Sequence, residues 1–198
     1  MNRLAMLSSL LLAAACSSSG HASFSLTDAP TDLVGVTAVN ITLRSIQAHV
    51  AGMEEMKNGD PTDSAIDDDG KWVTLTPAHR GFDLMTLTND ATAALGELEL
   101  PEGKITQLRL LLDTSLPANN SVALGTLICP LDTSRVAQKG IKINHPFKAL
   151  QVNKGGKVEA VIDFVASDSI TKTGDCAYQL APVIKIKRAK VDGKDFSF

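Results

Sequence analysis

The chain has 198 residues, of which 44% are hydrophobic and 21% are charged. This length and apolar content suit one folded domain and exclude a chain that is disordered throughout. The formal net charge of −3 argues against a nucleic-acid partner, because proteins that bind nucleic acids usually present a basic face.

Residues 1–15 are predicted to be an export signal. Arg3 supplies a positive charge ahead of the apolar run Leu4–Ala15, which is too short to cross a bilayer as a helix and fits a signal peptide. Small residues then lead directly into Cys16, an arrangement that resembles a bacterial lipobox. The resemblance implies a lipoprotein signal peptide that is cleaved after Ala15, with lipid on Cys16. The alternative is plain secretion, with cleavage at the same small residues.

Residues 16–23 are expected to be the lipidated cysteine and a flexible tether, since they are small and polar. No aspartate follows Cys16, and the sorting rule of enteric lipoproteins then implies the outer membrane. We therefore expect an exported protein whose first partner is the membrane, through the lipid anchor at the cell envelope.

Alternation of apolar and polar residues with period two dominates from Ser23 onward and predicts strands. Within residues 39–50 the apolar positions move from odd to even numbers, which predicts a β-bulge near Arg44–Ser45. Turn sequences rich in Gly, Pro and Asn separate the apolar runs. After the first strand at Phe24 and Leu26, the segments predicted as strands are 39–50, 71–76, 105–113, 122–129, 141–147, 157–165 and 178–191.

These short strands predict an all-β fold in residues 24–198. We expect a single antiparallel β-sandwich, immunoglobulin-like or prealbumin-like, with at most one or two short helical turns. Only residues 89–96 look helical, and nothing indicates a second domain.

Residues 51–70 interrupt the strand pattern and are strongly acidic. Carboxylate oxygens are the ligands that Ca²⁺ prefers, so calcium is the best candidate cofactor, although residues 65–70 are only a fragment of an EF-hand loop. The alternative is a solvated acidic loop that keeps the surface soluble. The candidate metal ligands are Asp60, Asp63, Asp67, Asp68 and Asp69.

Trp72 follows this loop and is the one tryptophan of the chain. Two interpretations stay open: a core residue, or an exposed platform on which a sugar ring stacks. Further along, Cys129 and Cys176 form an even pair once Cys16 is assigned to lipid. In an oxidising compartment such a pair predicts a disulfide. The alternative is two buried free thiols, while the spacing does not suit a zinc site.

Six phrases follow one another along the chain: Phe24–Pro30, Asp83–Asn89, Leu95–Gly103, Gln107–Asp113, Gly140–Asn144 and Tyr178–Ile184. Together they resemble one bacterial domain family of unknown function, DUF4382. The resemblance implies a secreted or lipid-anchored β-sandwich and brings no activity and no catalytic residues. Within the phrases we interpret Asp28 as a turn cap, and Asp83, Arg109 and Asp113 as a buried ion network or part of a ligand site.

The sequence contains no nucleophile elbow, phosphate loop or dinucleotide fingerprint, so we expect a protein that is not an enzyme. The first hypothesis is a lipid-anchored, non-catalytic binding or adhesion module for a glycan or a protein, with side chains presented by loops 51–70 and 114–121. The alternative is a structural or scaffold component of an outer-membrane or surface complex. A third hypothesis is calcium-dependent binding through acidic residues 54–69.

Overall fold

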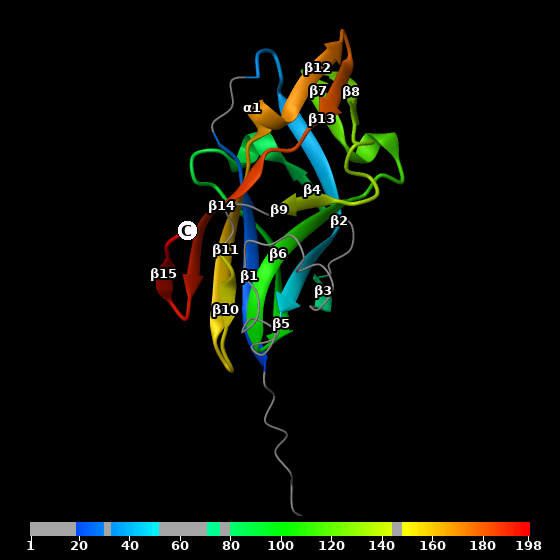
Figure 1. The fold of residues 1–198 in the computed structure, drawn as a ribbon. Helices are drawn as coiled ribbons and strands as arrows, with labels where there is room; N and C mark the ends of the chain where they lie inside the picture. The colour runs from blue at the N-terminus through cyan, green and yellow to red at the C-terminus, as the bar shows by residue number, and fades with distance from the viewer. Residues whose placement is uncertain (1–18, 30–32, 52–70, 76–79, 144–147) are drawn as a thin grey trace, which may run out of the picture.

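The computed structural model describes residues 19–29, 33–51, 71–75, 80–143 and 148–198. The described strands form two sheets that enclose one core (Figure 1). The first sheet contains, in spatial order, β15 (Lys194–Phe196), β14 (Ile184–Val191), β11 (Lys157–Phe164), β1 (Ser19–Thr27) and β5 (Ala93–Pro101).

The second sheet is longer and is built around β2 and β6. Its main path is β10 (Leu150–Val152), β6 (Gly103–Leu112), β2 (Ala38–Ala51), β7 (Ser121–Leu124), β8 (Leu127–Asp132), β13 (Ala177–Leu180) and β12 (Ile170–Gly174). Off this path, β3 (Lys71–Leu75) and β4 (Arg80–Asp83) pair with β2, and β9 (Ile141–Ile143) pairs with β6. The helical elements among the described residues are short: η3 (Leu84–Leu87), η4 (Pro117–Asn119) and α1 (Ala166–Ser169).

Alternate residues of the strands fill the space between the sheets. Phe24 of β1 and Phe164 of β11 are among the largest fully buried side chains, and Leu108 and Leu110 of β6 join the same cluster. Period-two alternation places such residues on one face of a strand, which is why the sequence pattern finds them. The predicted all-β sandwich is thus confirmed.

The strand pairing differs from a purely antiparallel sandwich at two places. β1 and β11 pair in parallel, as do β8 and β13. Long crossovers separate the members of each pair in the sequence, and parallel strands need such connections.

The boundaries of several elements also differ from the sequence predictions. The bulge is confirmed, because the register of β2 against β6 shifts between Leu43 and Ser45. The expected strand 178–191 is instead β13 and β14, which lie in different sheets and are separated at Pro182, where the backbone lacks an N–H. The segment 89–96 is not helical: Asn89 and Asp90 adopt positive φ, and β5 begins at Ala93.

The predicted tether is also wrong in its second half, because β1 begins at Ser19. Residues 19–23 pair with β5, and from His21 onward with β11 as well. Gly20 and Ala22 are buried, so the small residues serve close packing rather than flexibility. A Cβ atom on Gly20 would lie 2.5 Å from the main-chain oxygen of Asn153.

Gly20→Ala is therefore expected to lower the free energy of unfolding by about 1–3 kcal/mol through overpacking. The matched control is Gly81→Ala in β4, where a Cβ atom would meet only Thr42 Oγ1, at 3.8 Å. Urea unfolding of both variants measures the difference. Equal stabilities would mean that residues 19–23 behave as a tether after all.

Candidate functional site

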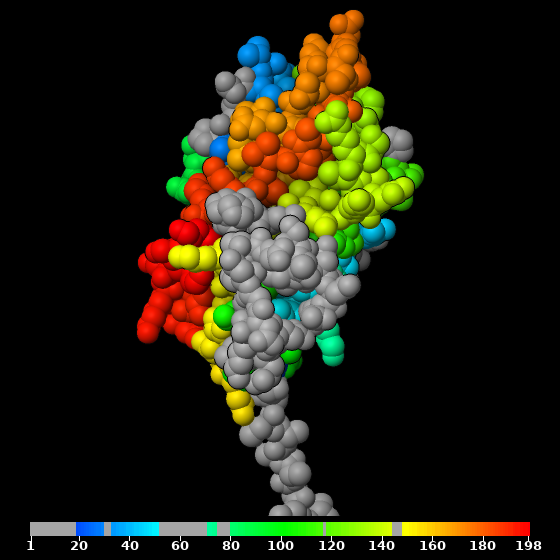
Figure 2. Space-filling model, viewed as in Figure 1, coloured from blue at the N-terminus to red at the C-terminus, as the bar shows by residue number. Residues whose placement is uncertain are grey.

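A pocket lies between β8 and the β12–β13 hairpin, and we call it the distal pocket. Its volume is about 420 Å³, and its lining includes the hydroxyl side chains of Thr114, Thr133, Ser134 and Thr173. Figure 1 shows β8, β12 and β13 at one end of the molecule and the beginning of β1 at the other. In Figure 2 the orange β12–β13 segment and the yellow-green segment that contains β8 lie side by side at this end.

The parallel pairing of β8 and β13 creates the pocket. Tyr178 lies opposite Leu131 in the register, and Gln179 lies opposite Asp132. No local sequence pattern marks this site, because its residues come from segments that only the tertiary fold brings together. Thr114 of the pocket lining belongs to the loop 114–121, from which the sequence pattern led us to expect exposed side chains.

Asp132 is the charged group of the distal pocket. Its Oδ1 accepts the main-chain N–H of Ser134 at 2.9 Å, and its Oδ2 accepts a hydrogen bond from Gln179 Nε2 at 3.3 Å. The hydrogen bond from the Ser134 backbone is the largest of several interactions that lower the pKa of Asp132. The result is an ionised carboxylate in a fixed orientation. A carboxylate offers about four acceptor positions, so it can accept further hydroxyl groups from a ligand.

The predicted disulfide is present beside this pocket. Cys129 of β8 and Cys176, between β12 and β13, have an S–S distance of 2.11 Å and a Cα–Cα distance of 5.0 Å. The bridge joins residues 47 positions apart. It ties together the two segments that form most of the pocket wall.

Trp72 lies elsewhere, on β3, opposite His49 of β2. Its side chain is half-buried, and the centroids of the two rings are 5.1 Å apart. The guanidinium carbon of Arg109 lies 4.0 Å from the Trp72 ring centroid, a cation–π contact. Trp72 is thus neither a fully buried core residue nor a free platform, because Arg109 occupies one face of the ring.

The ion network expected from Asp83, Arg109 and Asp113 does not form. Arg109 stacks on Trp72, while Asp83 Oδ1 accepts the main-chain N–H groups of Val39 and Met85. Asp113 Oδ1 accepts the N–H of Ser115. Both acids bond to the backbone because each stands at the end of a strand, where main-chain donors lose their ladder partners.

A second feature that the sequence analysis missed is a pair of buried carboxyl groups, Asp28 and Asp163. Asp28 follows β1, and its Oδ1 accepts the N–H of Ala166 at 2.9 Å, across 138 positions of the chain. Asp163 lies on β11, opposite Thr27, with its Oδ2 3.6 Å from Lys185 Nζ. Burial raises the pKa of Asp28 to about 6, and the charge of Asp163 adds to this effect.

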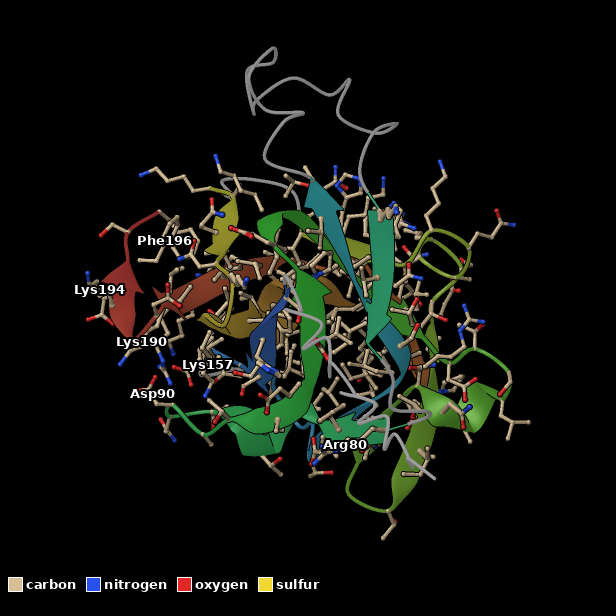
Figure 3. The ribbon with its side chains drawn as sticks, turned by 90° about the horizontal axis from the view of Figure 1, so that it is seen from below. Arg80, Asp90, Lys157, Lys190, Lys194 and Phe196 are labelled. Atoms are coloured by element: carbon tan, nitrogen blue, oxygen red, sulfur yellow. A yellow bond between two sulfur atoms is a disulfide. The ribbon has the colours of Figure 1, made fainter. Side chains whose placement is uncertain are left out.

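The described surface of the C-terminal hairpin is basic. Lys157, Lys190 and Lys194 lie on one side of the molecule, near Phe196 of β15, and Asp90 faces the same side (Figure 3). Lys187 Nζ is 2.8 Å from Asp90 Oδ1. Because β15 is an edge strand, its Lys194 suits the protection of that edge from pairing with other chains.

Some predicted residues lie outside the described part of the chain: Cys16 and the five aspartates at 60, 63, 67, 68 and 69. Among the described residues, no group of three or more His, Cys, Asp or Glu side chains is placed to hold a metal ion. No described helix has the length and apolar character needed to cross a bilayer.

A family model described as a domain of unknown function, DUF4382, matches residues 19–182. The match begins at the first residue of β1 and includes both the distal pocket and the buried carboxyl pair. No curated protein and no solved structure matches the chain.

Proposed function

We propose that this chain, which belongs to the DUF4382 family of domains of unknown function, is a lipid-anchored, non-catalytic binding module of the cell envelope. Membership of the family brings no activity with it. The ligand is a glycan that binds in the distal pocket. The observation that supports this proposal is the composition of that pocket, which combines several hydroxyl groups with a fixed carboxylate.

The volume of about 420 Å³ lies within the range of small-ligand sites and suits one or two sugar residues. Sugar hydroxyls both donate and accept hydrogen bonds, as do the side chains of Thr133, Ser134 and Thr173. Asp132 would accept a pair of ligand hydroxyls, while Ala177 and the small exposed part of Tyr178 offer apolar surface to the ligand.

The position of the pocket supports an anchored module. β1 starts at Ser19, three residues after Cys16, and three residues span at most about 10 Å. If Cys16 carries lipid, the start of β1 lies next to the membrane and the distal pocket lies at the far end of the domain (Figure 1). The pocket is then presented away from the membrane.

Replacing Cys16 by Ala is expected to release the protein from the membrane fraction, because the lipid is the proposed anchor. Detergent partitioning of wild-type and variant cells measures this. Wild-type partitioning of the variant would contradict lipidation at Cys16.

To test the glycan proposal, the lipidated protein in detergent is screened for binding to a panel of envelope and host glycans. Calorimetry then measures the affinity for any glycan that binds. Ala137→Trp fills the distal pocket from a turn residue and is expected to weaken binding at least about tenfold. Trp72→Ala is the matched control and should leave binding unchanged. If Trp72→Ala weakens binding and Ala137→Trp does not, the glycan site is at Trp72. If neither variant alters binding, both sites are excluded. Turnover of any glycan would overturn the non-catalytic assignment.

A second candidate function is the scaffold role, which one observation favours. Leu127 and Ile128 of β8 are 51% and 57% exposed, which is unusual for two large apolar neighbours in one strand. A protein partner would bury them. Replacing both by Ser should then reduce cross-linking to envelope proteins in intact cells without changing the glycan affinity.

A further inference from the structure

We propose that Asp28 and Asp163 bind a hard divalent cation of the calcium type between the ends of β1 and β11. Its proposed ligands are neither lining residues of the distal pocket nor members of the acidic segment 54–69. Its cation would hold together the two parallel strands and the start of α1.

Both carboxyl groups are buried, and neither is completely hydrogen-bonded. The Asp28 and Asp163 residues are 0% and 3% exposed. Among the described residues, Asp28 Oδ2 and Asp163 Oδ1 have no hydrogen-bond partner. A buried carboxylate oxygen that has lost its water and gained no partner is costly, so each such atom calls for an ion, a water or another group that is not yet identified.

The two acids belong to neighbouring strands. Thr27 and Asp163 are register partners, and Asp28 is the next residue after Thr27, so the two acids follow adjacent parallel strands to the same end of the sheet. Each carboxylate has one oxygen engaged: Asp28 Oδ1 by the Ala166 N–H and Asp163 Oδ2 by Lys185. These contacts limit the rotation of both groups. The charge of Asp163 contributes to the raised pKa of Asp28, so the two carboxyl groups are near enough to interact.

Little positive charge from the described residues lies near the two acids. Lys185 is the one described cation beside the pair, its side chain is 60% exposed, and its Nζ is 3.6 Å from Asp163. The next basic residues of β14, Lys187 and Arg188, face Asp90 instead. One peripheral ammonium group, beside Asp163, thus accompanies two buried acids. A divalent cation would supply the missing positive charge.

The donor set indicates which cation fits. Oxygen ligands select Ca²⁺ or Mg²⁺ over softer metals. Ca²⁺ tolerates irregular coordination completed by main-chain carbonyls and water, whereas Mg²⁺ demands a near-ideal octahedron. With two carboxylates and a competing ammonium, we expect a dissociation constant of roughly 0.1–1 mM, typical of extracellular calcium modules.

The experiment compares thermal unfolding of the full mature protein in EDTA and in about 10 mM CaCl₂. Calcium is expected to raise the Tm of the wild type by several degrees, because it binds only the folded state. Asp28→Asn should lose this shift, since the amide keeps the Ala166 hydrogen bond but is a poor calcium ligand. The control is a variant with Asp67, Asp68 and Asp69 all changed to Asn, which should keep the shift.

In EDTA the order of stability should reverse, with Asp28→Asn more stable than the wild type because the repulsion between the two acids is gone. A wild type that does not respond to calcium would overturn the proposal. So would an Asp28→Asn protein that keeps the shift, or a loop variant that loses it. Should Asp28→Asn fail to fold, Asp163→Asn removes the other free oxygen as an anionic ligand and gives the same test.

Discussion

Replacing Cys129 and Cys176 together by Ala is expected to lower the free energy of unfolding by about 2–4 kcal/mol. The bridge joins residues 47 positions apart, and the closed loop restricts the unfolded chain accordingly. Loss of native contacts adds little, because Ala fills most of the space of a buried cysteine at position 129. Urea unfolding of the variant, in parallel with the wild type with and without reductant, measures this loss.

Loss of the disulfide should destabilise the part of the sheet around β8 and β13 before it destabilises the rest of the domain. β8 and β13 share only two register pairs, Tyr178 with Leu131 and Gln179 with Asp132, so the disulfide is a large part of what holds this sheet end together. Without it, amide hydrogen exchange should increase first in β12 and β13, while β1 and β11 stay protected. The affinity for the proposed glycan ligand should fall as well. Reductant should reproduce the effect in the wild type and leave the variant unchanged. Exchange that increases uniformly, or equal stability of the two proteins, would contradict this role.

The sequence predicts most of the strands because the signal that marks a strand is local. Side chains alternate between faces with period two, so the runs around Val39, Ile105 and Val158 identify themselves. The bulge at Leu43–Ser45 was visible for the same reason, as a change of phase within one run. The sandwich architecture then follows from the number of such strands.

The partners of those strands were not predictable, because pairing depends on contacts between distant segments. Nothing within β1 indicates that β11, more than a hundred residues later, lies beside it in parallel. The long alternating run from Tyr178 to Val191 looked like one strand, although Pro182 marks the point where the chain crosses between sheets. Alternation reports which face is buried, and not which sheet buries it.

The same limit explains the site residues. Asp28 was interpreted as a turn cap because its sequence neighbours are Ala29 and Pro30, and only the fold reveals its hydrogen bond from Ala166. Asp163 sits in a run whose apolar residues dominate the pattern, so its burial left no trace in the sequence. The distal pocket combines residues near 114, 132 and 175, which no local motif connects.

The second large effect concerns the pH dependence of stability, and Asp28 is its source. With divalent ions chelated, the pKa of Asp28 is raised from 3.8 to about 6 in the folded protein. Between these values the folded state holds a proton that the unfolded state has released. Stability must therefore fall as pH rises through this window, by up to about 3 kcal/mol, and change little from this source above pH 7.

Exposed acids with lowered pKa values change the free energy of unfolding with pH in the opposite direction, so the measurement has to separate the contribution of Asp28 from theirs. Hydrogen bonding and Lys187 lower the pKa of Asp90, so its contribution is lost as pH falls. The informative quantity is thus the difference between wild type and Asp28→Asn, obtained by urea unfolding in EDTA at a series of pH values. Asn keeps an acceptor for the Ala166 N–H but cannot ionise, so the difference should shift by about 2–3 kcal/mol in favour of the variant between pH 4 and 7.

Asp90→Asn is the control, and its difference from the wild type should move in the other direction and by less, because that pair is exposed to solvent. A wild type and an Asp28→Asn variant whose stabilities differ by a constant amount across this range would show that Asp28 titrates normally. The Asp28 carboxyl group would then be hydrated in the folded protein, and its Oδ2 would not lack a hydrogen-bond partner. The pH-dependent stability difference between the wild type and Asp28→Asn is also expected to disappear when calcium is added. A cation that binds Asp28 must first displace its proton, so this result would link the raised pKa of Asp28 to the proposed cation site.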